Sequence, residues 1–234
     1  MTIINTSHRF IYVHIPKTAG TSVKHFLSQY TRYCDIEIGG SHDAEIIAPY
    51  YIKRFKLAKH SFAREIRDTV GRKDFKKFFK FAFVRNPFSR TASVYRFLKY
   101  NWRVWRDSAM MDEFSTLEEF ATSPFFKGPG PDRILMPQMR WLADAKEELC
   151  VDYIGRVETL EHDLAEICEK LKLTETPPKL EKKNTSKADK DAEFTAKTVD
   201  AIRRRYVLDF DGLKYSRDPD SILESDDAPL GLLS

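Results

Sequence analysis

Two parts of this sequence carry residues of the types and spacing that bind an anion. The first is Pro16–Ser22, which reads PKTAGTS and offers one mobile positive charge, three hydroxyl groups and a glycine without a Cβ. A loop that leads from a strand into a helix also presents unpaired backbone N–H groups and the positive end of the helix dipole. Phosphate or sulfate is therefore the predicted ligand of this loop, and the missing Cβ of Gly20 would let the backbone approach it closely.

The second part is Arg85–Ser93, which follows the apolar run Phe81–Val84. The apolar run predicts a buried strand, and Pro87 is suited to the first position of the next helix. Arg85 at the strand end and Ser93 one to two turns into the helix can converge on one phosphate, because a guanidinium fork and a hydroxyl both donate hydrogen bonds. A salt-bridged core arginine and an ordinary helix serine are the alternative interpretation at this point.

His60 is a candidate general base. It follows a predicted short strand, Phe55–Ala58, and precedes a predicted helix, Phe62–Val70, which should end at Gly71. An unperturbed imidazole pKa near 6.5 suits the removal of a proton from a hydroxyl group. From its neighbours alone, a surface or helix-capping histidine is the more common interpretation.

The elements that position these residues follow from the apolar periodicity. Phe10–Val13 predicts a strand before the loop, and the apolar residues from Val23 to Tyr30 recur at helical spacing after it. Strands alternate with helices, which predicts an α/β protein with a P-loop-like central parallel sheet flanked by helices. The other predictions are a helix ending near Pro49, a face shared by Arg90, Ser93 and Phe97, a core face of Val94, Leu98 and Trp102, a capping box of Ser115 and Glu118, a strand at Val151–Arg156 and a helix at Leu160–Leu171.

Length and composition are those of one globular domain. The chain has 234 residues, 42% hydrophobic and 32% charged, which predicts a single domain at residues 1–215 followed by an acidic tail at 216–234. No apolar run is long enough to cross a membrane and no leader is visible, so a cytoplasmic protein is expected. Cys34, Cys150 and Cys168 are widely spaced and are expected to be reduced thiols, with no metal site.

Charge is distributed unevenly along the chain. Residues 53–106 hold 17 lysine and arginine residues against Glu65, Asp68 and Asp74, although the whole chain has a net charge of only +4. A block of this kind suggests an acidic ligand or partner, and a nucleic-acid-binding protein is one alternative. The block has no recognisable nucleic-acid-binding motif, and many of its charges are expected to be solvated.

The order of residues in the first loop separates it from common nucleotide-binding loops. A nucleoside-triphosphate P-loop places its lysine after the last glycine, whereas Lys17 stands three residues before Gly20. The stretch His14–Ser22, HIPKTAGTS, instead resembles the 5′-phosphosulfate loop of the carbohydrate-type sulfotransferases. Arg85–Ser93 is similar to the 3′-phosphate motif of the same family, R-N-P-x-x-R-x-x-S. The family also resembles this chain at Lys59–Ser61, at Ile154–Leu160 and at Asn184–Lys187.

The resemblance implies a sulfotransferase fold and transfer of a sulfuryl group from 3′-phosphoadenosine 5′-phosphosulfate (PAPS) to a hydroxyl of a carbohydrate or polysaccharide. It implies His60 as the base and Lys17 as the group that stabilises charge on the departing nucleotide, with no metal required. An atypical kinase or nucleotide hydrolase, which would need Mg²⁺, is the enzymatic alternative. The residues expected to bind the nucleotide are Pro16, Lys17, Thr18, Ala19, Gly20, Thr21, Ser22, Arg85, Ser93 and Ser186.

Overall fold

The computed structural model describes residues 1–101, 109–173, 194–220 and 231–232. The chain divides into two compact units. We call residues 1–84, 138–181 and 228–234 the sheet unit, and residues 85–137 and 182–227 the helical unit. The prediction of one domain at 1–215 with a separate tail stays a prediction.

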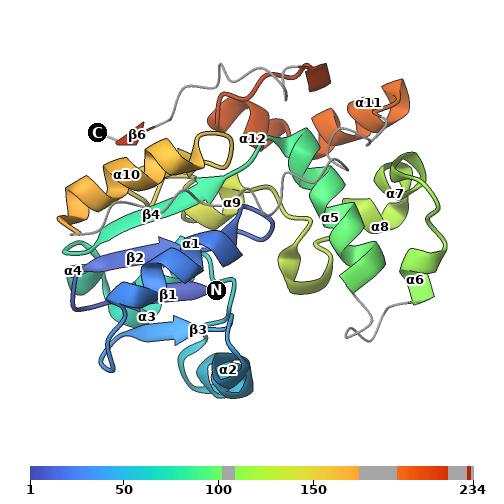
Figure 1. Cartoon of the computed structure of the whole chain (residues 1–234). Helices are drawn as coiled ribbons and strands as arrows, with labels where there is room; N and C mark the ends of the chain where they lie inside the picture. Colours follow the sequence, from blue (N-terminus) through green and yellow to red (C-terminus); the bar gives the residue numbers. More distant parts are fainter. Residues whose placement is uncertain (102–108, 174–193, 221–230, 233–234) are drawn as a thin grey trace. The chain divides into compact units, whose positions relative to one another are not determined.

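The sheet unit is built on a six-stranded sheet in the order β3-β1-β2-β4-β5-β6 (Figure 1). Its three central strands, β2, β4 and β5, are parallel, whereas β1, β3 and β6 join antiparallel to their neighbours. The predicted α/β class with a central parallel sheet is therefore confirmed, and the outer strands make the whole sheet mixed. The strands are β1 Thr2–Asn5, β2 Phe10–Val13, β3 Ile36–Ile38, β4 Phe79–Val84, β5 Tyr153–Arg156 and β6 Gly231–Leu232.

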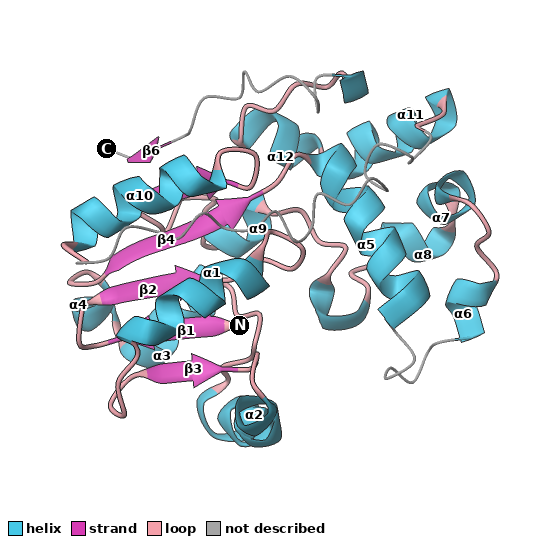
Figure 2. Ribbon diagram, in the orientation of Figure 1, coloured by secondary structure: helices cyan, strands magenta, loops and turns pink. Residues whose placement is uncertain are grey.

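Both faces of the central strands are covered. Phe10 and Tyr12 of β2 and Phe81 and Phe83 of β4 belong to one core cluster with apolar residues of α1 (Gly20–Leu27) and α10 (Leu160–Leu171). Figure 2 shows these two helices side by side over the same face of the sheet. The alternate strand residues, such as Ile11 and Ala82, are also fully buried. Burial on both faces accounts for the continuous apolar runs of β2 and β4.

Helix α2 extends further than predicted. It spans His42–Phe55 and contains Pro49 in its interior. Ser41 caps its N-terminus, because the Ser41 hydroxyl accepts a hydrogen bond from Ala44 N. Proline has no N–H to donate to the carbonyl of Glu45, one turn earlier. Pro49 and Glu45 are both exposed, so water can hydrate that carbonyl and the helix continues.

The predicted strand at Phe55–Ala58 is wrong. Phe55 is the last residue of α2, and Lys56 adopts a left-handed conformation with φ 58° as the helix ends. The N–H groups of Lys56 and Leu57 bond back to the carbonyls of Ile52 and Tyr51, which closes the helix. A four-residue apolar run fits a helix end as well as a strand, and tertiary contacts decide between them.

The other helices of the sheet unit are short. Helix α3 follows the predicted range closely and ends at Gly71, and it contacts α9. The three cysteines are free thiols, as predicted. The remaining elements of this unit are η1 Ser28–Tyr30, α3 Ala63–Val70, α4 Arg72–Phe75 and α9 Met139–Leu142.

The described part of the helical unit contains no strand. Helix α5 begins at Pro87, as predicted, and α7 and α11 contact it and each other. Phe120 of α7 is fully buried among the rings of Tyr95, Phe114, Phe125 and Phe126. The elements are α5 Pro87–Asn101, α6 Ala109–Asp112, α7 Leu117–Thr122, α8 Pro124–Lys127, η3 Pro131–Arg133, α11 Ala196–Arg205 and α12 Val207–Gly212.

The capping box of α7 lies one residue later than predicted. The hydroxyl of Thr116 accepts from Glu119 N at 3.1 Å, and the Glu119 carboxylate accepts from Thr116 N at 3.2 Å. Starting the helix at Leu117 places Leu117 and Phe120 together in the core. Glu118, the predicted cap partner, instead accepts a hydrogen bond from Thr195.

Candidate active site

The loop between β2 and α1 has a backbone suited to an anion. Lys17 and Ala19 both have positive φ, 69° and 58°, on either side of Thr18. Left-handed conformations are uncommon outside glycine, and their alternation with ordinary ones turns successive N–H groups toward one side. Strained backbone of this kind concentrates in ligand-binding loops. The loop also leads directly into the N-terminus of α1, as predicted.

The hydroxyl of Thr18 is used inside the loop. Thr18 is fully buried, and its Oγ1 donates to the carbonyl oxygen of Ile15 at 2.9 Å. The side chain therefore stabilises the turn. A nucleotide contact from Thr18 would have to come from its backbone N–H, whereas Thr21 is exposed and Ser22 is half-buried.

Gly20 makes room for a neighbouring side chain, a contact that the sequence did not predict. A Cβ built on Gly20 would lie 1.7 Å from Nε2 of His14, so the imidazole occupies the space that a side chain would fill. The close approach made possible by this glycine is to His14. Whether Gly20 also contacts a ligand stays a prediction.

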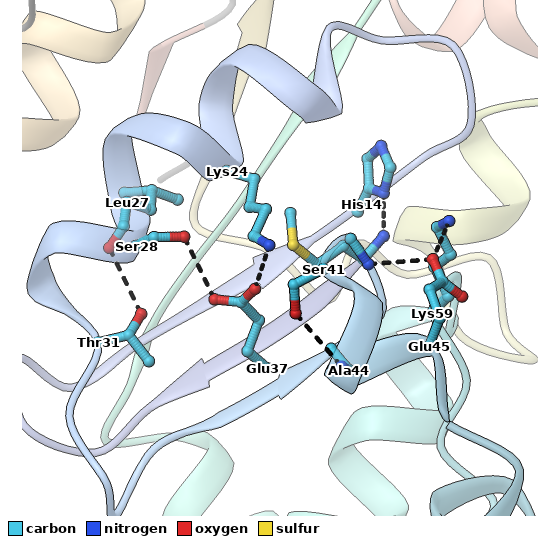
Figure 3. A network of polar contacts seen from close by, with 12 residues as sticks. His14, Lys24, Leu27, Ser28, Thr31, Glu37, Ser41, Ala44, Glu45 and Lys59 are labelled. Atoms are coloured by element: carbon cyan, nitrogen blue, oxygen red, sulfur yellow. Dashed lines mark hydrogen bonds and ion pairs between the residues drawn. The ribbon is translucent and has the colours of Figure 1, made fainter. Parts of the chain in front are cut away.

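His14 is buried and uncharged at neutral pH. Burial lowers its pKa well below the usual value, and electrostatic interactions with the Met1 amino group, His60, Lys59 and Lys17 lower it further. The Met1 amino group contacts Nδ1 of His14 (Figure 3). His14 is thus a structural part of the loop.

His60 lies directly beside this loop. Its Nδ1 is 3.2 Å from the backbone carbonyl oxygen of His14, and the two imidazole rings are 4.5 Å apart. A carbonyl oxygen can only accept, so we assign the proton of the neutral ring to Nδ1. The Nε2 atom then carries the lone pair that a general base requires.

The backbone around His60 is fixed by the first strand. Thr2 donates from Oγ1 to the carbonyl of Ala58 at 3.0 Å, and Ser61 accepts from Ala58 N at 2.8 Å. The neighbouring Lys59 forms an ion pair with Glu45 of α2, 2.5 Å between Nζ and Oε1 (Figure 3). These contacts hold the histidine in place on a segment without regular structure.

The arginine motif occupies the start of α5 in the helical unit. Arg85 is half-buried, and its Nε donates to Oγ of Ser89 at 3.0 Å. The Asn86 side chain accepts from Phe88 N at 2.9 Å, and the Asn86 carbonyl accepts from Arg90 N. Asn86 therefore caps the helix and fixes the backbone next to Arg85.

Arg90, the second arginine of the motif, is buried at the start of α5. Only 1% of Arg90 is exposed, and its guanidinium donates to the carbonyls of Ile134 and Met136, at 2.8 and 3.2 Å. The second arginine of the motif therefore binds the 134–136 loop to α5.

Arg96 was not predicted as a site residue. It lies one turn beyond Ser93 on α5, is half-buried, and has a pKa lowered by burial and then by the positive charge of Arg85. Two guanidinium groups that act on each other in this way favour a bound anion. The i, i+3 spacing from Ser93 is the signal that could have identified Arg96.

Both motifs begin at one edge of the sheet. Strands β2 and β4 are parallel neighbours with Val13 opposite Ala82, so their carboxyl ends share an edge. The loop starts directly after Val13 and Arg85 directly after Val84. In α/β proteins, ligands bind at this edge. Ser186, the last predicted contact, lies outside the described residues.

The comparison with known families agrees with this geometry. A profile of the sulfotransferase family matches residues 1–216. The match covers most of the chain, so the chain belongs to the sulfotransferase family. Comparison with the curated proteins and with the solved structures gave no significant match.

Two further observations concern metals and membranes. In the described ranges, no group of three or more His, Cys, Asp or Glu side chains is arranged to hold a metal ion. Among the same residues, none of the helices has the length and apolar character needed to cross a membrane.

Proposed function

We propose that this protein transfers the sulfuryl group of PAPS to a hydroxyl of a carbohydrate acceptor. The observation that carries the proposal is the contact between His60 Nδ1 and the carbonyl of His14, which joins a histidine base to an anion-binding loop. Membership of the sulfotransferase family supports the reaction type. The kinase, hydrolase and nucleic-acid-binding alternatives have no comparable support.

The loop residues and α1 would bind the 5′ side of the donor. Lys17, the backbone N–H groups of residues 17–20, and the hydroxyls of Thr21 and Ser22 are the donor groups of this segment. The positive charge of Lys17 and the dipoles of these groups complement a negatively charged phosphosulfate. The left-handed conformations of Lys17 and Ala19 are typical of a backbone that binds an anion. Lys17 would stabilise the negative charge that develops on the departing nucleotide.

The arginine motif would bind the other end of the donor. Arg85 and Ser93, together with Arg96, supply two positive charges and a hydroxyl for a doubly charged 3′-phosphate. ATP has no 3′-phosphate, so a site that requires this group would accept PAPS as the donor and reject ATP. Ser186 is retained as a proposed contact from the late loop.

His60 would act as the base. Nε2 accepts the hydroxyl proton as the acceptor oxygen attacks sulfur, while Nδ1–H keeps its bond to the carbonyl of His14 and holds the ring in position. The acceptor is proposed to be a carbohydrate or polysaccharide, in keeping with the family resemblance and with the basic segment 53–106. The cytoplasmic location stays a prediction.

The proposal is tested by assaying transfer directly. The protein is incubated with radiolabelled PAPS and a panel of neutral and acidic polysaccharides, without metal and with a chelator. Sulfated polysaccharide and 3′-phosphoadenosine 5′-phosphate should form in equal amounts. A thermal-shift comparison adds a binding test, because a ligand that binds only the folded state raises its melting temperature. Stabilisation by ATP with Mg²⁺, and none by 3′-phosphoadenosine 5′-phosphate, would refute the proposal.

A further inference from the structure

The outer face of α2 is unusually apolar. Ala44 and Ala48 are buried, and the helix contacts β3 at the end of the sheet (Figure 1). On the other side, Ile46 is 57% exposed and Tyr50 is 72% exposed, with Ile47 also exposed between them. Single exposed apolar residues are normal, but a cluster on one helix face indicates a contact surface.

The acidic and basic residues of this face lie at opposite ends of the helix. Asp43, Ile46, Ile47, Tyr50 and Arg54 are spaced i, i+3, i+4, i+7 and i+11, so they form one stripe along the helix. We call these five residues the α2 stripe. It is acidic at its N-terminal end, apolar in the middle and basic at its C-terminal end, and all five residues are exposed.

Charged residues next to the α2 stripe leave its acidic end and its basic end distinct. Glu45 is not part of the stripe and forms an ion pair with Lys59 (Figure 3). Lys53 is exposed beside Arg54 and strengthens the basic end. The sequence has no acidic residue between Ile46 and Arg64.

We propose that the α2 stripe is the interface of a homodimer in which two copies of α2 pack antiparallel. A two-fold interface requires a surface that is complementary to itself. Antiparallel packing brings Asp43 of each copy to Arg54 of the other and buries the apolar middle of both stripes. Antiparallel packing also places the two helix dipoles in opposite directions, which is the more favourable arrangement of two neighbouring dipoles.

Pairing Asp43 with Arg54 fixes the register of the two helices. In that register Ile47 of one copy lies opposite Tyr50 of the other, and Ile46 lies opposite Tyr51. A hollow of about 470 Å³ is present at this end of the helix, lined by Tyr50, Tyr51, Lys53, Arg54 and Phe55. The hollow offers an apolar space for the Ile46 side chain of the second copy.

Other occupants match the stripe less well. A parallel pair would place Asp43 beside Asp43 and Arg54 beside Arg54, which is repulsive. An anionic lipid surface would attract Lys53 and Arg54 and would repel Asp43. The combination of an acidic end, an apolar middle and a basic end therefore favours a second copy of the same chain.

The test is the molar mass of the full chain in solution, measured by light scattering over a concentration series. The wild-type chain should form dimers. Asp43→Arg and Arg54→Asp should each weaken dimerisation at least about tenfold, because like charges then meet across the interface. The double variant, Asp43→Arg with Arg54→Asp, should restore dimers, because the pairs are re-formed with the charges exchanged.

A matched charge exchange provides the control. Asp200 and Arg204 pair on the exposed face of α11, so Asp200→Arg with Arg204→Asp should leave the molar mass unchanged. Circular dichroism confirms that each variant folds. A monomeric wild-type chain, with or without binding to vesicles of phosphatidylserine, would overturn the proposal. Failure of the double variant to recover dimers would overturn it as well.

Discussion

The Nδ1 atom of His60 lies 3.2 Å from the backbone carbonyl oxygen of His14, although 46 residues separate the two in the chain. This contact sets the tautomer of one histidine through the backbone of another. It also makes the position of the proposed base depend on the conformation of the loop that we propose binds the donor.

Replacing His60 should separate turnover from binding. His60→Ala should lower kcat by about 10²–10⁴-fold, because a positioned general base contributes about that much. The affinity for 3′-phosphoadenosine 5′-phosphate should change less than about twofold. Steady-state kinetics and calorimetry give the two values. His162→Ala, at an exposed position of α10, is the control, and normal turnover in His60→Ala would place the base elsewhere.

Gly20 and His14 should be energetically coupled. Gly20→Ala should lower the free energy of unfolding by about 1–3 kcal/mol, because the new methyl group overlaps the imidazole of His14. In the background of His14→Ala, the same glycine substitution should cost much less. Urea denaturation of the four proteins in this double-mutant cycle measures the coupling. If the effects of Gly20→Ala and His14→Ala on the free energy of unfolding simply add, the overlap with the imidazole is not the reason that residue 20 is a glycine.

Arg96 should distinguish nucleotides by their 3′-phosphate. Arg96→Gln should weaken the binding of 3′-phosphoadenosine 5′-phosphate by about tenfold or more, because a hydrogen bond to a charged group contributes about 1.5–3 kcal/mol. Binding of adenosine 5′-monophosphate should be unchanged. Arg204→Gln, which removes an exposed arginine from α11, controls for net charge. An equal loss for both nucleotides would assign Arg96 a general structural role.

Stability should fall in acid because His14 is buried without charge. Its pKa is lowered in the folded state, so below about pH 6.5 the unfolded chain binds a proton that the folded chain does not. The free energy of unfolding should therefore decrease by up to about 1.4 kcal/mol for each pH unit below that point, and should level off above it. His14→Gln should flatten this dependence, while His162→Gln should not. If the free energy of unfolding depends on pH in the same way in the wild type and in both variants, His14 is not the cause of the acid sensitivity.

The strongest elements were predictable from sequence. Strands β2 and β4, helices α3 and α10, and the start of α5 at Pro87 follow from apolar runs with clear boundary residues. The strand predicted at Phe55–Ala58 failed because those residues close α2 through a left-handed Lys56, and a short run cannot distinguish the two. Strands β1 and β3 were not predicted because β1 has only two adjacent apolar residues, Ile3 and Ile4, and β3 is only three residues long.

The site was predictable in its motifs but not in its internal contacts. Pro16–Ser22 and Arg85 do follow β2 and β4 at one sheet edge, as the motifs indicated. The sequence could not reveal that Gly20 accommodates His14, because that contact depends on the path of the loop in three dimensions. The same holds for Arg90, whose carbonyl partners lie more than 40 residues further along the chain.

The chain enters the helical unit between Val84 and Arg85 and returns at Gln138. Arg85 is thus attached by one peptide bond to a buried strand and by its side chain to the first turn of α5. Insertions or deletions at the far end of the helical unit would leave both attachments intact. A change of length at that end would therefore not alter how Arg85 is held at the end of β4.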